Sequence, residues 1–347
     1  MKKNILRIII WTASIIIGLS AATAAVGGWY LYASNITDTP GAEKYYLYVT
    51  HYSTMDDVVQ TLSQDGMLKR ESTFRLVAKI SKSEEKLKPG RYLIEPGLSN
   101  YKLLQKLRNG LQEPVKFTFN NINFIEDFCG KAGAVFHFDS LQMLEAMRDK
   151  QLLDSLGIKP EMLLGQLLPN TYEVYWTISP EGLLIRLLNE SDRFWNEERK
   201  AQLESRGLTK DDVLILASII QKETNHVSEM SRMAGVYINR LKLGMKLQAD
   251  PTVKYAVGDL SIRRVLFRHL EHPSPWNTYY TEGLPPGVIC APNPATIDQI
   301  LNYEEHDYLF FVANPGYNST HTFAETHRQH EQNRARYLAW LRQEGIR

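Results

Sequence analysis

The sequence begins with an uncharged apolar run that restricts where the rest of the chain can lie. Lys2, Lys3 and Arg7 precede Ile8–Tyr32, a stretch of 25 residues without a charged side chain. A helix of that length, rising about 1.5 Å per residue, crosses the ~30 Å hydrocarbon core of a bilayer. Because the positive charges come before the span, the pattern predicts a cytoplasmic N-terminus and export of everything after about Ser34.

A cleaved signal peptide is the alternative interpretation of this run. Ala22–Ala24 has the small-x-small pattern of a cleavage site. The apolar run continues through Val26–Tyr32, however, and Trp11 and Trp29 lie near its two ends, as aromatic residues do at membrane interfaces. These features favour a retained anchor, and the sequence leaves cleavage open.

The remaining composition is that of a folded protein. The 347 residues leave room for about two domains. A formal net charge of +1 without blocks of like charge gives no indication of a nucleic-acid partner. Cys129 and Cys290 are the only cysteines, and the sequence leaves open whether they pair. No Cys–His spacing of a metal site occurs, so no metal is predicted.

After the span, polar and turn-forming residues at 35–43 predict a linker. A small α+β module is expected at 44–112, because β-branched and aromatic strands alternate there with amphipathic helices. In the second of these helices, Phe74, Leu76, Val77 and Ile80 are expected to face inward. The predicted order is strand, helix, helix, strand and helix, at 45–50, 53–63, 71–81, 88–97 and 100–110.

The larger region, 113–347, is expected to be a mixed α+β catalytic region, which makes the whole chain α+β. Residues 181–205 predict an amphipathic helix. Asp211–Thr224 is apolar nearly all round, which is typical of a buried central helix, and Thr209 with Asp212 forms a capping-box pattern at its start. Further helices are expected at about 229–242 and 324–344, with turns and short strands between them.

The buried helix ends in a carboxylate. On a helix, Glu223 shares a face with Ile219 and Ile220, the most apolar positions of the segment. Burial there disfavours the charged form and raises the pKa of the acid. A carboxylic acid that stays protonated near neutral pH can act as a general acid on a leaving oxygen. The alternative is a helix end that emerges into water with Glu223 solvated.

Small polar side chains and aromatic rings gather in the following hundred residues. Amide and hydroxyl groups beside aromatic faces suit the hydroxyls and apolar faces of a sugar chain, although each residue alone is also ordinary turn chemistry. The candidate substrate-binding residues are Gln248, Asp250, Thr252, Asn277, Thr278, Tyr279, His321 and Phe323.

Four motifs resemble a known family. "LASIIQKET" (216–224), "VYINRLKLGMKLQADPTVKYAVG" (236–258), "NTYYTEGLPPGVI" (277–289) and "HTFAETHRQHEQN" (321–333) are similar, in the same order, to the motif series of the MltG-type (YceG-like) endolytic murein transglycosylases. The resemblance extends from the N-terminal span to the C-terminus and is tightest over 212–333.

The resemblance implies an exported enzyme that crosses the bacterial inner membrane once through residues 8–32, with its catalytic region in the periplasm. A LysM-like module would follow the span. The enzyme would cleave nascent peptidoglycan between N-acetylmuramic acid and N-acetylglucosamine, leave a 1,6-anhydro end, and thereby end strand elongation. Peptidoglycan strands are the implied partner, with peptidoglycan synthases or division proteins as candidate protein partners. No cofactor is implied.

The motif departs from the family at one position. Members commonly read "ASIVEKET", with two glutamates, whereas this chain has Gln221 at the first of them and Glu223 at the second. The catalytic acid is therefore expected to be Glu223. A catalytically inactive wall-binding scaffold remains an alternative, and so does a hydrolase in which Asp250 activates water. A di-iron carboxylate site is a weaker rival, because Glu223-x-x-His226 is not matched by the other ligands that such a site needs.

Overall fold

The computed structural model describes residues 2–37, 44–316 and 319–346, and it is a mixture of helices and short strands. The expected α+β class is confirmed. The chain forms two compact units, which are described separately below. The smaller contains Met1–Lys116, Val135–His137 and Glu173–Ile178, and the larger contains Phe117–Ala134, Phe138–Tyr172 and Ser179–Arg347.

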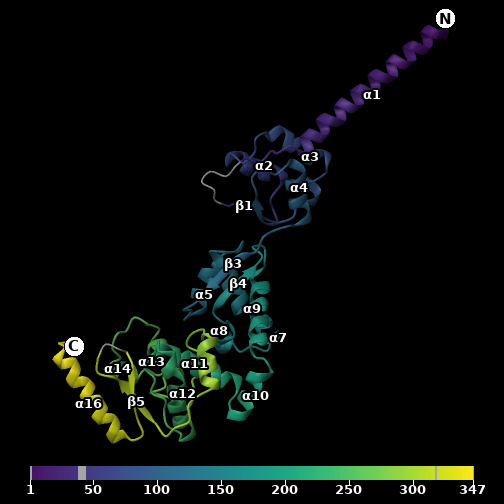
Figure 1. Cartoon of the computed structure of the whole chain (residues 1–347). Helices are drawn as coiled ribbons and strands as arrows, with labels where there is room; N and C mark the ends of the chain where they lie inside the picture. The colour runs from purple at the N-terminus through teal and green to yellow at the C-terminus, as the bar shows by residue number, and fades with distance from the viewer. Residues whose placement is uncertain (1, 38–43, 317–318, 347) are drawn as a thin grey trace. The chain divides into compact units, whose positions relative to one another are not determined.

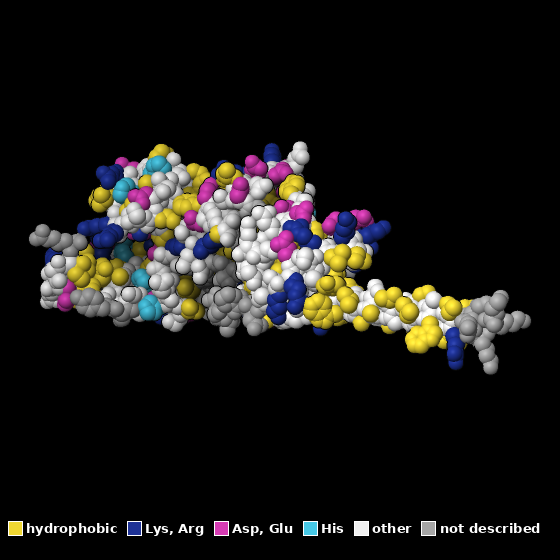
Figure 2. Space-filling view, turned by 90° about the horizontal axis from the view of Figure 1, so that it is seen from above, with side chains coloured by type: hydrophobic (Ala, Val, Ile, Leu, Met, Phe, Trp, Pro, Cys, Tyr) yellow, Lys and Arg dark blue, Asp and Glu magenta, His cyan; other side chains and the backbone are white. Residues whose placement is uncertain are grey.

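The N-terminal apolar run forms one long helix, α1 (Lys2–Tyr32), drawn in purple in Figure 1. Within it, Arg7–Tyr32 is long and apolar enough to cross a membrane, and none of its most apolar window is buried inside the protein. Figure 2 shows hydrophobic side chains exposed along this projecting helix. Ile8 and Ile17 are 63% and 68% exposed. Exposure of so many apolar side chains to water would be unfavourable, so the surface of this helix suits an apolar environment.

The smaller unit has the predicted order of elements. Its two strands pair antiparallel, with Tyr45 opposite Ile94 and Val49 opposite Gly90. A capping box at Thr54 starts the first helix after the sheet, as the polar side chain in front of an apolar stripe predicts. The elements are β1 (Tyr45–Val49), α2 (Met55–Gln64), α3 (Glu71–Ile80), the 3-10 helix η2 (Glu84–Lys86), β2 (Gly90–Ile94) and α4 (Asn100–Asn109).

The packing of α3 differs in part from the expectation. Phe74 and Val77 are buried in the core of the smaller unit, as predicted. Leu76 and Ile80 are 47% and 72% exposed, so the expectation that they face inward is wrong. They lie one turn apart, outside the face with which α3 packs against α1, α2 and α4.

The chain just after α1 is part of the smaller unit. Ile36 is 1% exposed, and the Asn35 amide donates to Oδ1 of Asn100 at 2.7 Å. The Asn100 amide in turn donates to the carbonyl of Tyr30 at 2.8 Å, which joins the end of α1 to α4. The first residues of the predicted linker, 35–37, are thus packed, while 38–43 lie outside the described residues. The functional domain boundaries stay a prediction.

Strands β3 (Val115–Phe119) and β4 (Asn170–Val174) pair with each other, and the chain passes from one unit to the other within each of them. Between these strands lie α5 (Ile125–Gly133), α6 (Ser140–Arg148), α7 (Lys150–Ser155), the 3-10 helix η3 (Pro160–Met162) and α8 (Leu163–Gln166).

Residues 181–205 form two helices instead of the single predicted one. These are α9 (Pro180–Phe194) and α10 (Glu197–Arg206). Trp195 is 4% exposed at the break, and the Asn196 side chain accepts a hydrogen bond from the backbone N–H of Arg199, which caps the second helix. An Asn side chain stabilises a helix when it caps the N-terminus and is less favourable inside a helix, so a new helix begins here.

The centre of the larger unit is α11 (Lys210–Glu223), which packs against α12 (Val227–Lys242), α13 (Asp250–Val257) and α15 (Pro294–Leu301). The predicted capping box of Thr209 and Asp212 is present. The segment before α15 also lies against α11, because the backbone N–H of Ile289 donates to Oγ of Ser218 at 3.1 Å. Figure 1 shows α11, α12 and α13 in the green part of the chain.

The chain ends in a hairpin and a helix. Strands β5 (Phe310–Ala313) and β6 (His321–Ala324) pair antiparallel, and α16 (His327–Gln343) packs on both, as expected for the final helix. One further short helix, α14 (Phe267–Leu270), follows α13. Both cysteines are free and buried, so the question left open by the sequence is answered: Cys129 and Cys290 do not pair.

Candidate active site

Helix α11 is buried along most of its length and ends in a carboxylate, that of Glu223. Every residue from Val213 to Ile220 is buried. The helix ends directly after Glu223, because Thr224 has extended backbone angles and its Oγ1 accepts a hydrogen bond from the N–H of His226. Glu223 is therefore the last helical residue, and it keeps part of its surface accessible. It is buried enough to be poorly hydrated, but it is not as fully enclosed as the residues before it.

The carboxyl group of Glu223 is held by a tyrosine from the neighbouring helix. Oη of Tyr237, on α12, donates to Oε1 of Glu223 at 2.9 Å, and Tyr237 itself is 1% exposed. Burial raises the pKa of Glu223 to about 7, and the negative charge of Asp250 adds to this effect. The Tyr237 hydrogen bond and the charge of Lys254 act in the opposite direction, since both stabilise the carboxylate.

A second tyrosine–carboxylate pair lies at the start of α13. Oη of Tyr279 donates to Oδ1 of Asp250 at 2.8 Å. Burial, and then the neighbouring Asp250, raise the pKa of Tyr279 well above its usual range, and Glu223 contributes to the same shift. The two pairs therefore lie within electrostatic reach of each other. Of their carboxylates, that of Asp250 belongs to an exposed residue.

Three of the predicted sugar-binding residues are fully buried. Thr252, Asn277 and Thr278 are each 0% exposed. Oγ1 of Thr278 accepts from the N–H of Ala249 at 3.0 Å and lies 2.8 Å from Oγ1 of Thr252. The Asn277 amide donates to two backbone carbonyls at 2.9 Å, and its oxygen accepts from the N–H of Tyr279. Their polar atoms are used inside the protein.

These buried groups place the exposed ones. The N–H of Gln248 donates to the carbonyl of Thr278 at 3.1 Å, which fixes the turn that leads into Asp250. Gln248 has φ of 52°, a left-handed conformation that is uncommon for a residue other than glycine. Gln248 and Asp250 are exposed and Tyr279 is partly exposed, so these three of the predicted residues remain able to contact a ligand.

The last two predicted residues lie on β6. His321 is bound to Glu229 of α12: its N–H donates to Oε1 at 2.8 Å, and its Nδ1 lies 3.1 Å from Oε2. The ring of Phe311 meets both Tyr237 and His321 edge-on, with centroid distances of 5.8 and 5.6 Å. Phe323 lies beside the same ring at 6.0 Å. The hairpin therefore supports α12, which carries Tyr237, through His321 and Phe311.

Gln221, the departure from the family motif, faces away from the acid into the scaffold. Its Nε2 donates to the carbonyl of Ala291 at 3.2 Å, and its Oε1 accepts from the N–H of Asn293 at 2.6 Å. Asn293 is the N-cap of α15. Gln221 thus joins α11 to the start of α15 with both halves of its amide. Its presence gives no reason to regard Glu223 as inactive.

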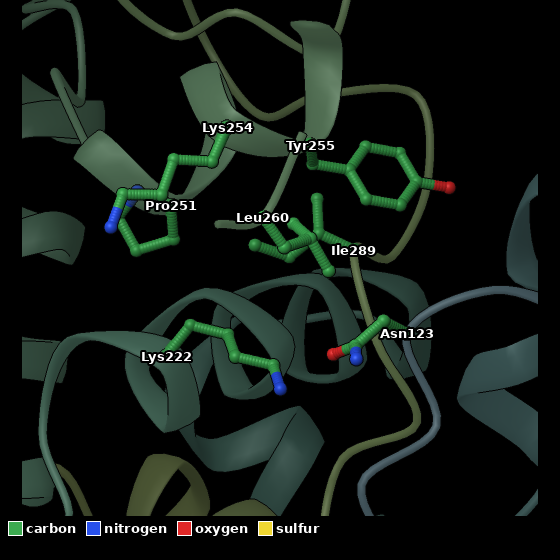
Figure 3. A pocket seen from close by; sticks show the side chains of 7 residues that line it. All are labelled: Asn123, Lys222, Pro251, Lys254, Tyr255, Leu260 and Ile289. Carbon is green, nitrogen blue, oxygen red and sulfur yellow. The ribbon is translucent and has the colours of Figure 1, made fainter. Parts of the chain in front are cut away.

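A cavity of about 250 Å³ opens beside the C-terminal turn of α11. Its apolar wall consists of Pro251, Tyr255, Leu260 and Ile289. Figure 3 shows Lys222 below this wall, the end of the Lys254 side chain beside Pro251, and Asn123 on the opposite side. Lys222 adjoins Glu223 in sequence, and the charge of Lys254 acts on Glu223. The cavity therefore lies against the last turn of α11 and against α13, although Glu223 itself is not part of its lining.

Sequence reasoning missed Tyr237. A detectable signal existed, because a tyrosine within a helix as apolar as "AGVYI" needs a partner for its hydroxyl group. Glu229 and Lys254 were missed as well. Nothing local distinguishes them from the other charged residues of their helices.

Most of the chain is similar to known proteins. The model of the YceG-like family matches residues 47–336. An endolytic murein transglycosylase of Bacillus subtilis is 24% identical over 333 residues, which cover 90% of this chain and 91% of the relative. One from Streptococcus pneumoniae is 26% identical over 93% of this chain, which spans 64% of that protein.

A solved structure is similar too. The crystal structure of a YceG-like protein from Listeria monocytogenes superimposes with a TM-score of 0.57 and 26% identity, covering 84% of this chain and 98% of that one. Since the family match extends over most of the sequence, including both tyrosine–carboxylate pairs, the chain belongs to the YceG-like family.

Proposed function

We propose that the chain is a membrane-anchored endolytic murein transglycosylase. It cleaves nascent peptidoglycan strands between N-acetylmuramic acid and N-acetylglucosamine and leaves 1,6-anhydro ends, which ends the growth of the strand. The observation that carries the proposal is the pKa of Glu223, which burial raises to about 7 while the residue stays partly accessible. The names of the relatives support the choice of substrate.

In the proposed reaction, one carboxyl group performs both proton transfers. Glu223 gives its proton to the glycosidic oxygen as positive charge develops at the anomeric carbon. The resulting carboxylate then takes the proton of the muramic acid 6-hydroxyl while that oxygen attacks the anomeric carbon. The C1–O bond to the leaving sugar breaks, the C1–O6 bond forms, and Glu223 regains its proton. No water enters.

The neighbours of Glu223 suit these two steps. Before the reaction, burial and the charge of Asp250 favour the protonated form of the acid. Between the steps, the Tyr237 hydroxyl stabilises the carboxylate through its 2.9 Å hydrogen bond. The negative charge of Asp250 also favours the positive charge on the sugar ring. Gln248, Asp250 and Tyr279 are the candidate sugar contacts, with Thr252, Asn277 and Thr278 holding them in place.

Hydrolysis is the second candidate, because Asp250 is an exposed carboxylate within electrostatic reach of Glu223. Two carboxylates that flank the bond are the usual requirement for hydrolysis. In that reaction Asp250 would activate a water molecule. The products differ: a hydrolysed strand has a reducing end that is heavier than the anhydro end by one water.

Digestion of defined, uncrosslinked glycan strands tests both candidates. The wild type is expected to release anhydro ends, and Glu223→Gln is expected to lose at least about 10²-fold in rate, the lower range for general acid–base catalysis. Mass spectrometry identifies the ends. Anhydro ends released by Glu223→Gln at nearly the wild-type rate would remove Glu223 from the mechanism. Reducing ends from the wild type would establish hydrolysis.

Along the sequence, most of the smaller unit follows the membrane span and precedes Glu223. We propose that α1 anchors the chain in the bacterial inner membrane with the larger unit in the periplasm, and that the smaller unit is LysM-like. It either holds glycan chains or acts as a spacer. Since 35–37 are packed into it, a deletion should remove 35–112 together. Unchanged affinity for glycan strands after this deletion would identify a spacer.

A further inference from the structure

The cavity beside α11 has features that the acid chemistry does not use. Its volume of about 250 Å³ lies just below the ~300–1,000 Å³ of typical small-molecule sites, so it can hold a short substituent but not a whole disaccharide with its peptide. Lys222 from α11 and Lys254 from α13 face it from two sides (Figure 3). A substituent of the sugar that occupies the active site would lie within its reach.

Both charged side chains that line the cavity are positive. The lining includes no carboxylate, and among the residues that the structure describes neither Lys222 nor Lys254 forms an ion pair within 4.0 Å. Asp250 precedes Lys254 by one helical turn, but its Oδ1 accepts from Tyr279. Two ammonium groups that share a cavity repel each other, and a bound anion relieves that repulsion.

The third polar group in the lining lacks a partner. Oδ1 of Asn123 is buried and has no hydrogen-bond partner among the described parts of the chain. An unpaired buried carbonyl oxygen is unfavourable, and a ligand with an N–H group would satisfy it. In Figure 3 the Asn123 amide points towards the same space as the ammonium group of Lys222.

The apolar wall is rigid. Ile289 is 2% exposed, and the ring of Tyr255 stacks on Phe124 with a centroid distance of 5.4 Å and an interplanar angle of 15°. Such a wall suits small methyl side chains. Carboxylates for the two lysines, an amide N–H for Asn123 and methyl groups for the wall are together the features of a short acidic peptide.

We infer that this cavity, which we term the stem pocket, binds the acidic peptide that muramic acid carries in peptidoglycan. The inference rests on the proposed function, because it places the peptide-bearing sugar next to Glu223. The stem pocket makes the enzyme select strands whose peptides are present and whose carboxyl groups are free. A free lactyl carboxylate on a peptide-free muramic acid has part of this chemistry, and the experiment below separates the two ligands.

The test compares three uncrosslinked strands with the full-length protein in detergent. One carries stems with free carboxyl groups, one carries the same stems with these groups amidated, and one has had its stems removed by an amidase. The readout is the ratio of kcat/KM for acidic over amidated stems. A ratio is needed because the charge of Lys254 also acts on Glu223 and can change the rate on every strand.

The wild type is expected to prefer acidic over amidated stems by about fivefold, the upper range for a partly exposed ion pair. Lys222→Gln combined with Lys254→Gln is expected to bring the ratio close to one, and Lys222→Arg to preserve it. Lys242→Gln is the matched control, since Lys242 is an exposed lysine outside the cavity. Asn123→Ala is expected to weaken cleavage of both stem-bearing strands relative to the stripped strand.

Binding of the same strands to Glu223→Gln separates the stem pocket from the chemistry. Tighter binding of the acidic strand that disappears in the lysine variants supports the stem pocket even if no strand is cleaved, whereas absence of cleavage by the wild type refutes the proposed function alone. Equal binding and cleavage of acidic and amidated stems would overturn the stem pocket. If stripped strands are bound and cleaved as well as acidic ones, the lysines bind the lactyl carboxylate instead of the peptide.

Discussion

Oη of Tyr237 lies 2.9 Å from Oε1 of Glu223 and donates a hydrogen bond to it, so two residues 14 positions apart on successive helices form one proton-handling unit. Burial raises the pKa of both groups, that of Glu223 to about 7. The carboxyl group is thereby protonated in about half of the molecules near neutral pH, and it can give up its proton and recover it during one reaction cycle.

The first prediction concerns the pH dependence of cleavage. Because Glu223 must be protonated to act as an acid, kcat/KM should fall about tenfold per pH unit above a pKa of about 7. The measurement is initial-rate kinetics on uncrosslinked strands across neutral pH. Glu223→Gln should show only a low rate, and its pH–rate profile should lack this falling limb. A falling limb that persists in the variant would report the titration of another group.

The second prediction concerns Tyr237. Its hydrogen bond stabilises the carboxylate, so Tyr237→Phe should raise the pKa of Glu223 and move the falling limb to higher pH, by on the order of one unit for the loss of one charge-assisted bond. Tyr172→Phe is the matched control, because it removes a buried tyrosine hydroxyl that binds the Leu168 carbonyl instead of the acid. An unshifted limb in Tyr237→Phe would separate this tyrosine from the titration.

Asp250 should have the opposite effect. Its charge helps to raise the pKa of Glu223, so Asp250→Asn should lower that pKa and move the limb to lower pH. The same variant should still release anhydro ends, now at a reduced rate around neutral pH. If the wild type released reducing ends and Asp250→Asn lost them, Asp250 would be the base of a hydrolase.

The fourth prediction concerns stability. In the unfolded chain the pKa of Glu223 is near 4.5, and in the folded protein it is about 7, so the folded state binds this proton more tightly. The resulting stabilisation is complete below pH 4.5 and is lost as the pH rises through about 7. The measurement is urea unfolding of the wild type and Glu223→Gln at pH 5 and pH 8. The free energy of unfolding of the variant, relative to that of the wild type, should be higher at pH 8 than at pH 5 by on the order of 1–3 kcal/mol. An equal difference at both pH values would contradict the raised pKa.

The fifth prediction concerns Gln221. Gln221→Ala loses the contacts to Ala291 and Asn293, and Gln221→Glu loses only the donor to Ala291. Both should lower the free energy of unfolding, Gln221→Ala by about 1–2 kcal/mol, with cleavage per folded molecule within about threefold of the wild type. Thermal unfolding and strand digestion measure the two quantities. A stable Gln221→Glu protein with a rate changed by more than about 10²-fold would place this residue in the chemistry.

Much of the local structure could be predicted because it depends on residues that are close in sequence. The uncharged run of Ile8–Tyr32 determined α1, the spacing of apolar residues determined the helices of the smaller unit, and Thr209 with Asp212 determined where α11 begins. Where two local signals competed, the prediction failed. At Trp195–Asn196 an N-cap divided a helix that the apolar period alone would have continued.

Glu223 was also predicted from the local sequence, since it ends a helix that is buried from Val213 to Ile220. The hydrogen-bond partners of the polar side chains could not be predicted in this way. Asn277 and Thr278 have the chemistry of sugar ligands, yet they are fully buried and bind backbone groups, while Tyr237 lies in an apolar helix and reaches the acid. An amide or a hydroxyl group suits a ligand and a buried turn equally well, and only the packing of distant segments decides which of them it meets.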